Sequence, residues 1–293
     1  MAHHSSKNWI LFVVLTLLWG TSFMQITISL RAFTPEQLVP WRLVLAALVL
    51  LAYMLYRKQR FPHGLKHWAK FAVFATIGNI LPYWLITTGQ QSITSGMAGL
   101  LMAVMPLATM MLAHWFIPNE KLNRYRIIGF VLGISGVLFV LWPNLINGHN
   151  SVYGALIVLL AAACYAINTI LIRLYSNYEI SVVSAGVMLC AAVISTLIWP
   201  QMWQVSWPQE HIESLVALIW LGIFPTGIAS VIYFILVKDA GPTFVSNNNY
   251  IIPVIAYVAG AWVLGEQVSY WDLVALAVIL IGIAISRKPV VSR

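Results

Sequence analysis

Ten stretches of mostly apolar residues run through the chain, joined by short connections. A helix needs about 20 such residues to cross a bilayer, and only helices and closed barrels satisfy their backbone groups there. Charged residues are 8% of the chain, against about 25% in a soluble domain, too few to cover a water-facing surface. We therefore predict an all-α polytopic membrane protein. Its ten expected spans lie at roughly residues 9–29, 36–56, 69–88, 93–116, 125–142, 152–173, 180–200, 213–237, 242–264 and 270–287.

The positive charges are distributed unevenly between alternate connections. With the N-terminus inside, all of the 16 Lys and Arg residues except Arg31 and Arg42 fall at inner ends or inner connections. Because basic residues favour the cytoplasmic side, both termini are predicted to be cytoplasmic. The net charge of +8 then reflects topology and anionic lipid headgroups, so the expected partner is the bilayer and not nucleic acid.

A weak internal repeat appears when the chain is shifted by 146 or 147 residues, about half its length. Five spans in each half require opposite topology, and inverted repeats place a substrate site near the bilayer midplane. We therefore expect two inverted repeats, residues 1–147 and 148–293. The matched positions are Trp19 with Tyr165, Ser22 with Asn168, Pro106 with Pro253, and Glu120 with Glu266.

Several local motifs occur in a fixed order along the chain. They are Trp19-Gly20-Thr21-Ser22-Phe23; Pro35, Arg42 and Ala46-Ala47; Pro106 and Glu120; and Pro253 and Gly265-Glu266. With them the whole chain resembles the EamA-type branch of the drug/metabolite transporter superfamily. That resemblance implies export of small metabolites, such as amino acids, their derivatives or toxic amphiphiles, across a bacterial inner membrane. Pro118-Asn119 departs from the usual Leu-Gly before the fifth span.

Three consecutive carboxamides, Asn247, Asn248 and Asn249, lie inside the ninth apolar stretch. An unpartnered polar group in hydrocarbon costs a few kcal/mol. Three neighbours on a helix spread over roughly 200°, so at least one is expected to face a hydrated cavity or a ligand. The alternative is that they join helices to one another. Their repeat counterparts, residues 100–102, are apolar, which favours ligand contact.

Other polar and aromatic residues inside the spans are candidates for the same cavity. Asn79 and Tyr83 share a helix face at i, i+4 spacing, and Asn168 follows Tyr165 by three positions. Pairing of each Asn with a neighbouring group is the alternative, and packing is the alternative for Trp19. The predicted substrate-binding residues are Trp19, Asn79, Tyr83, Tyr165, Asn168, Asn247, Asn248 and Tyr250.

Pro106, Gly241 and Pro253 are expected to let the fourth and ninth spans flex. Arg42 is the one full charge well inside a span. It is expected to reach the outer surface or pair with Glu36, the alternative being attraction of a substrate carboxylate. No Asp or Glu lies in the middle of a span, which leaves His114 or a boundary acid for any proton coupling.

These features favour a transporter that works by alternating access around an aromatic, carboxamide-lined cavity. A cavity without fixed charge would favour net-neutral solutes such as amino acids. Neither a nucleotide-binding glycine loop nor a catalytic or metal-spaced constellation is found, so no enzyme, cofactor or metal is expected. The alternatives are a proton-coupled exporter of cationic amphiphiles and a non-transporting scaffold. We expect a monomer or a weak homodimer.

Overall fold

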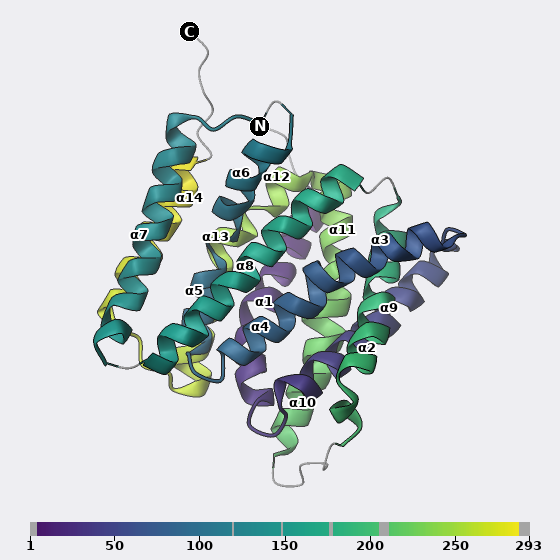
Figure 1. Ribbon diagram of the computed structural model, residues 1–293, viewed down its shortest axis with the longest axis horizontal. Coiled ribbons are helices and arrows are strands. Elements are labelled where there is room, and N and C mark those ends of the chain that lie inside the picture. Colours follow the sequence, from purple (N-terminus) through teal and green to yellow (C-terminus); the bar gives the residue numbers. More distant parts are fainter. Residues whose placement is uncertain (1–4, 119, 148, 176–177, 205–210, 287–293) are drawn as a thin grey trace.

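The computed structural model describes residues 5–118, 120–147, 149–175, 178–204 and 211–286, which form helices and short connections with no strand among them (Figure 1). Each of the ten predicted stretches is helical. The first half contains α1 (Ser6–Ser29), α2 (Pro35–Tyr56), α3 (Leu65–Ala75), η1 (Thr76–Ile80), α4 (Leu81–Gly89), α5 (Ser95–Met102), α6 (Met105–Phe116) and α7 (Arg124–Asn147). The second contains α8 (His149–Tyr175), α9 (Ile180–Ile198), η2 (Pro200–Trp203), α10 (Ile212–Leu221), η3 (Gly222–Ile228), α11 (Ala229–Ala240), α12 (Pro242–Val245), α13 (Asn248–Leu264) and α14 (Tyr270–Ser286).

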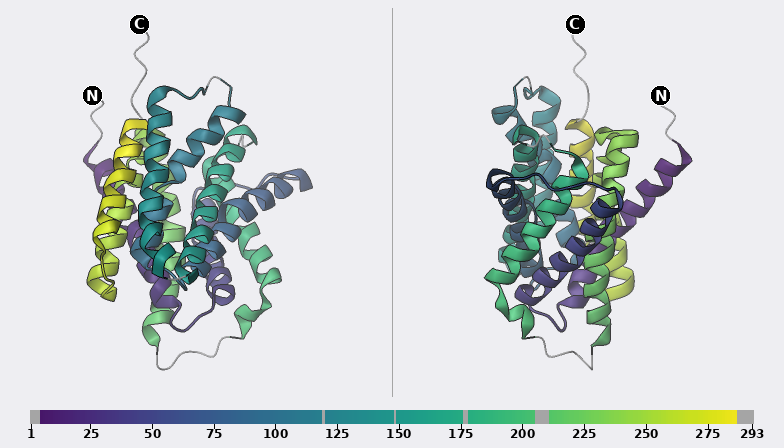
Figure 2. Two further views of the ribbon diagram at one scale, coloured as in Figure 1. Left: turned by 60° about the vertical axis from the view of Figure 1, so that its left-hand side comes forward. Right: turned by 90° about the vertical axis from the view of Figure 1, so that its right-hand side faces the viewer.

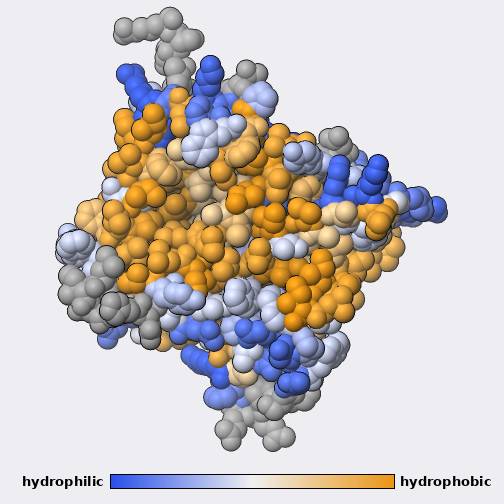
Figure 3. All heavy atoms as spheres, in the orientation of Figure 1, coloured by the Kyte–Doolittle hydropathy of each residue, from blue (hydrophilic) through white to orange (hydrophobic). Residues whose placement is uncertain are grey.

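An apolar girdle crosses the middle of the molecule, and hydrophilic residues gather at its two ends (Figure 3). Among the described residues, eight helical stretches are long and apolar enough to span a membrane, and α13 and α14 are shorter apolar helices. The start of α1 and the end of α14 lie at the same end of the bundle (Figures 1 and 2). This arrangement fits the predicted even number of spans. The cytoplasmic location of that end stays a prediction.

Two spans contain π-helical segments at equivalent places in the two halves. Segment η1 begins at residue 76 and η3 at residue 222, and 222 − 76 = 146, which matches the repeat. Pro82 lies in the first turn of α4, which follows η1, and Pro225 lies inside η3. A π-helical turn disturbs the regular hydrogen-bond ladder and often occurs at functional sites.

Two more spans are broken into separate helices. The fourth is interrupted at residues 103–104, between α5 and α6, and the ninth at residues 246–247, between α12 and α13. The two parts of the fourth span have different neighbours. Both parts contact α8, but α5 packs mainly against α13 and also against α1, whereas α6 packs mainly against α8 and also against α7.

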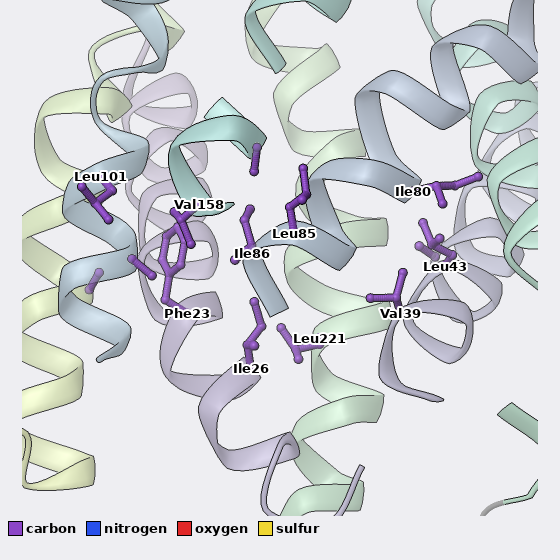
Figure 4. Close-up of a cluster of buried hydrophobic side chains, with 14 of the residues drawn as sticks. Phe23, Ile26, Val39, Leu43, Ile80, Leu85, Ile86, Leu101, Val158 and Leu221 are labelled. Carbon is purple, nitrogen blue, oxygen red and sulfur yellow. The ribbon is translucent and has the colours of Figure 1, made fainter. Parts of the chain in front are cut away.

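One continuous core joins the two halves of the chain. The interhalf contacts run between α2 and α9, α1 and α13, and α4 and α8. Figure 4 shows side chains of this core, among them Ile26 of α1, Leu43 of α2, Leu85 of α4 and Leu221 of α10. The last helices of the halves, α7 and α14, form a separate pair at the edge of the bundle (Figure 1), where Gly129 and Gly282 allow close backbone approach.

Candidate functional site

A cavity of about 380 Å³ lies between the two halves. Helices α1, α2, α4, α5, α6 and α8 contribute to it, together with η3, α11, α12 and α13. Its wall is mostly apolar and aromatic with a few polar groups, which is the usual character of a small-molecule site. The aromatic lining residues are Trp19, Phe23, Tyr83, Tyr165 and Tyr233, and the polar ones are Ser22, Arg42, Ser230, Ser246 and Asn249.

Trp19, Tyr83 and Tyr165, all named from the sequence, line this one cavity. The Nε1 of Trp19 donates to the carbonyl oxygen of Pro225 at 3.1 Å, inside the π-helical segment η3. Its ring lies against Tyr233, with centroids 5.6 Å apart. The rings of Tyr83 and Tyr165 meet edge to face, with centroids 6.5 Å apart. Two aromatic pairs therefore supply flat surfaces on which a ligand can stack.

Arg42 places a full positive charge in the cavity wall. Arg42 is only 5% exposed, and its Nε donates to the hydroxyl of Thr226 at 2.8 Å. The Thr226 hydroxyl in turn donates to the carbonyl of Leu221 at 2.7 Å, so it is an acceptor toward Arg42. The guanidinium carbon lies 3.9 Å above the centre of the Tyr83 ring, a cation–π contact.

The expectation of a cavity without fixed charge is therefore wrong. Within the described parts of the chain, Arg42 has no carboxylate within 4.0 Å, and the cavity lining contains no Asp or Glu. Glu36, the suggested partner, instead accepts from the Nε1 of Trp84 at 3.3 Å. The sequence interpretation placed Arg42 at the outer surface or beside Glu36 and not in the cavity. The distance of Arg42 from the end of its span does not reveal the direction in which its side chain points.

Asn249 of the Asn trio lines the cavity, and Asn247 and Asn248 do not. Asn247 lies in the break between α12 and α13 and is exposed. Asn248 is buried and lies 2.5 Å from the Thr16 hydroxyl of α1, which also donates to Phe12. One hydroxyl proton cannot serve both acceptors, so the pair is best satisfied if the Asn248 amide nitrogen faces Thr16. Asn248 thus joins α13 to α1.

The remaining predicted binding residues lie outside the cavity lining. Asn79 is half-buried within η1, and Tyr250 packs against the main core. Asn168 packs so closely on Gly78 that a Cβ there would lie 2.1 Å from its Nδ2. The buried Oδ1 of Asn168 has no hydrogen-bond partner among the described residues. The tight contact with Gly78 fits a packing role for Asn168.

The proposed flexing residues occupy distinct structural positions. Pro106 lies in the first turn of α6, just after the break in the fourth span, and Pro253 lies inside α13 and lines the cavity. Gly241 has φ of 86°, which strains other residues, and it separates α11 from α12. His114 is outside the lining, where its Nδ1 accepts from the backbone N–H of Leu122 at 3.3 Å.

The two ends of the cavity differ. Lining residues reach the exposed Pro242 at the end where α1 begins, which we call the open end. At the opposite end, which we call the closed end, the lining residues Phe23, Ile26 and Ile86 are buried. Next to Phe23, the Nε2 of Gln90 donates to the Phe23 carbonyl at 2.8 Å and to the Thr27 hydroxyl at 3.0 Å. These contacts tie α4 to α1 beyond the cavity.

Glu266 provides the second closure, between the halves. Its carboxylate accepts from the backbone N–H of Ser95 at 2.8 Å, the Ser95 hydroxyl at 2.9 Å and the backbone N–H of Gly96 at 3.2 Å. A carboxylate at a helix N-terminus satisfies free N–H groups and complements the helix dipole. Glu266 therefore holds the start of α5 against the end of α13.

Sequence reasoning missed Tyr233, Ser230 and Thr226, which contribute to the cavity wall or to holding Arg42. All three lie in or just after η3. A Ser or Thr in an apolar stretch is ordinarily accommodated by its own helix backbone, and Ser230 does bond the Thr226 carbonyl. The nearby Pro225 was the available signal of an irregular helix.

The model of the EamA-like transporter family matches residues 7–142 and 152–287. The chain belongs to this family. Family members are transporters and not enzymes, and the two matched segments correspond to the two halves of the fold. The helices, the internal repeat and the interhalf cavity agree with this assignment.

Several relatives align with nearly the whole chain. The uncharacterized transporter YoaV of Bacillus subtilis is 23% identical over 92% of this chain and 93% of its own length. The uncharacterized inner membrane transporter YedA of Escherichia coli is 22% identical over 92% and 87%. A chloroplastic WAT1-related protein of Arabidopsis thaliana is 25% identical over 96% and 70%. A solved crystal structure, 22% identical, superposes with a TM-score of 0.68 over 96% of this chain and 97% of that one, and so shows the fold.

Proposed function

We propose that this membrane transporter exports small metabolites, amino acids and related solutes, across a bacterial inner membrane by alternating access. The observation that carries the proposal is the cavity between the two halves, whose lining is buried at the closed end and reaches the exposed Pro242 at the other. A site open toward one end and sealed at the other is what one state of such a cycle requires. The open end is cytoplasmic if the distribution of Lys and Arg sets the orientation.

Within this proposal, the substrate stacks on the aromatic pairs and is oriented by a few polar groups. Trp19 and Tyr233 form one face, and Tyr83 and Tyr165 the other. Asn249 supplies both a donor and an acceptor to the lining. Because Arg42 adds a positive charge to the same wall, cationic amphiphiles are disfavoured as substrates.

Facilitated movement is favoured over proton coupling. The described lining contains no Asp, Glu or His, the groups commonly used as proton relays in membrane carriers. His114 accepts a hydrogen bond from the connection after α6, which supports a structural role for it. Exchange of solutes down their own gradients needs no such relay.

The test is uptake of labelled amino acids and related metabolites into proteoliposomes, with and without an imposed pH gradient. We expect saturable flux without the gradient. Flux that needs the gradient would contradict the facilitated mechanism, and absence of saturable flux for the whole panel would contradict the proposed substrates.

Two asparagines two residues apart provide a matched pair for the cavity itself. Asn249→Leu removes a lining polar group, and we expect flux to fall at least about tenfold. Asn247→Leu changes the same residue type at an exposed position and is expected to retain most flux. The reverse result, with Asn247 essential and Asn249 dispensable, would mean that the cavity is not the transport route.

A further inference from the structure

The guanidinium of Arg42 has two terminal nitrogens whose N–H donors are unused. Its Nε is engaged by Thr226 and its flat face by Tyr83, and it makes no other hydrogen bond or ion pair with the described residues. The two terminal nitrogens are therefore left with no acceptor, although the residue is only 5% exposed. These nitrogens form the edge of the guanidinium that binds a carboxylate through two parallel hydrogen bonds.

A buried cation without a counter-charge is costly. Taking an ion out of water costs several kcal/mol unless another charge or several hydrogen bonds compensate. The Thr226 hydroxyl and the Tyr83 ring compensate in part, but neither carries a negative charge. The described lining has no acidic residue, so water in the cavity and a bound anion are the remaining partners, and only the anion supplies a counter-charge.

The surroundings limit what kind of anion fits. The wall near Arg42 is aromatic and apolar, with Tyr83, Tyr165 and Ile86 among its residues. No second cationic side chain lines the described cavity, which argues against a dianion such as a phosphate monoester. One charge on the protein and an apolar wall suit a solute with one carboxylate and an apolar body.

We infer that Arg42 is the specificity-determining residue of the cavity and binds the carboxylate of the substrate, so that carboxylates with an apolar or aromatic body are preferred over their uncharged amides. This inference rests on the proposed function, because it names the substrate class of the same cavity. Thr226 is a positioning residue that holds the guanidinium by its Nε, leaving the terminal nitrogens for the ligand.

Matched acid and amide pairs test the inference directly. The probes are butyrate and butyramide, benzoate and benzamide, and 3-phenylpropionate and 3-phenylpropionamide, with binding measured calorimetrically on the full chain purified in detergent. We expect at least one acid to bind about tenfold or more tightly than its amide, a difference of roughly 1.4 kcal/mol. Equal affinities within every pair, or no acid binding at all, would overturn the inference.

Variants then assign the preference to Arg42. Arg42→Gln is expected to abolish the preference for the acid while leaving the amide affinity within about twofold. Arg42→Lys is expected to keep part of the preference, because lysine retains the charge but not the two parallel donors of the guanidinium. Thr226→Val leaves the charge in place but releases the Nε, so it is expected to weaken acid binding while leaving amide binding unchanged. An Arg42→Gln protein that still prefers the acid would contradict the assignment. If that variant does not fold, the pair measurements on the unaltered protein and Arg42→Lys still decide.

Flux measurements on the same pairs separate this inference from the proposed function. Acid-selective binding without flux in proteoliposomes would support the carboxylate site and contradict transport. Saturable flux that does not distinguish acids from amides would support transport and contradict the carboxylate site.

Discussion

The two ends of the cavity are built from corresponding parts of the two halves, yet only one is closed. At the closed end, Glu266 binds the start of α5 and brings it against α13. At the open end, its repeat counterpart Glu120 pairs with Arg173 of α8, and α6 lies against α8 and α7. Two glutamates at matching positions of the repeat, each before the last span of its half, therefore have different partners in one structure. Under the proposed alternating access, we expect the two glutamates to hold opposite ends of the cavity closed in turn.

The largest expected effect comes from removing the Glu266 contact at the closed end. Glu266→Ala leaves the Ser95 and Gly96 N–H groups and the Ser95 hydroxyl without their acceptor. A buried donor left without its acceptor costs about 1–3 kcal/mol. Water replaces part of the three lost bonds here, so we expect the free energy of unfolding to fall by about 2–4 kcal/mol. The thermal unfolding temperature of the purified variant measures it.

The accessibility of the cavity gives a second readout for the same change. Ser22→Cys, with Cys164 and Cys190 replaced by Ala, should react with an impermeant maleimide from one side of the membrane, and from both sides once Glu266 is removed. Asp272→Asn is the control, since Asp272 lies nearby in the first turn of α14 and accepts from the backbone N–H of Ser269. One-sided labelling and unchanged unfolding in Glu266→Ala would show that the contact does not close the cavity.

The second prediction compares the packing of α5 and α6. A Cβ on Gly99 would lie 2.4 Å from the Cβ of Ala256 on α13, an atom fixed to the backbone. A Cβ on Gly133 of α7 would lie 2.1 Å from the Cδ1 of Leu107 on α6, the movable end of a side chain. We expect Gly99→Ala to cost about 1–3 kcal/mol and Gly133→Ala less than about 1 kcal/mol. Equal losses of thermal stability would mean that the closed end is not the more rigid one.

The smallest effect on stability is expected for Glu120→Gln. Its pair with Arg173 is partly exposed, with side chains 29% and 56% accessible, and such pairs contribute about 0–1 kcal/mol, less at high salt. Transport should nevertheless fall severalfold if Glu120 holds the opposite end closed in the other half of the cycle. Thermal unfolding and proteoliposome flux on one preparation measure both. A variant with unchanged stability and unchanged flux would show that Glu120 does not have the role at its end of the cavity that Glu266 has at the other.

The sequence predicted the fold and the aromatic part of the candidate site well. Ten apolar stretches determine the helices, and the repeat alignment of Trp19 with Tyr165 pointed to two residues that line the same cavity. Both predictions depend on regular spacing along a helix. Where the helices are regular, the spacing and the structure agree.

Irregular helices explain where the sequence interpretation and the cavity diverge. Asn79 and Tyr83 were expected to share a face, but Asn79 lies in the π-helical η1, where the wider turn changes the direction of each following side chain. The break at residues 246–247 likewise shifts the phase of α13, so that Asn249 and not its neighbours faces the cavity. The local sequence does not determine such a change in the direction of the side chains, because packing against other helices selects where a helix widens or breaks.

The charge on Arg42 also distinguishes the empty carrier from the loaded one. With a carboxylate bound, the cavity is neutral as the halves exchange their open and closed ends. Without it, an unpaired cation must pass through a state sealed from water on both sides, at a cost of several kcal/mol. We therefore expect the return step to be slow when the cavity is empty. The protein would then exchange one organic anion for another faster than it releases either alone, as an antiporter does, with no coupling ion.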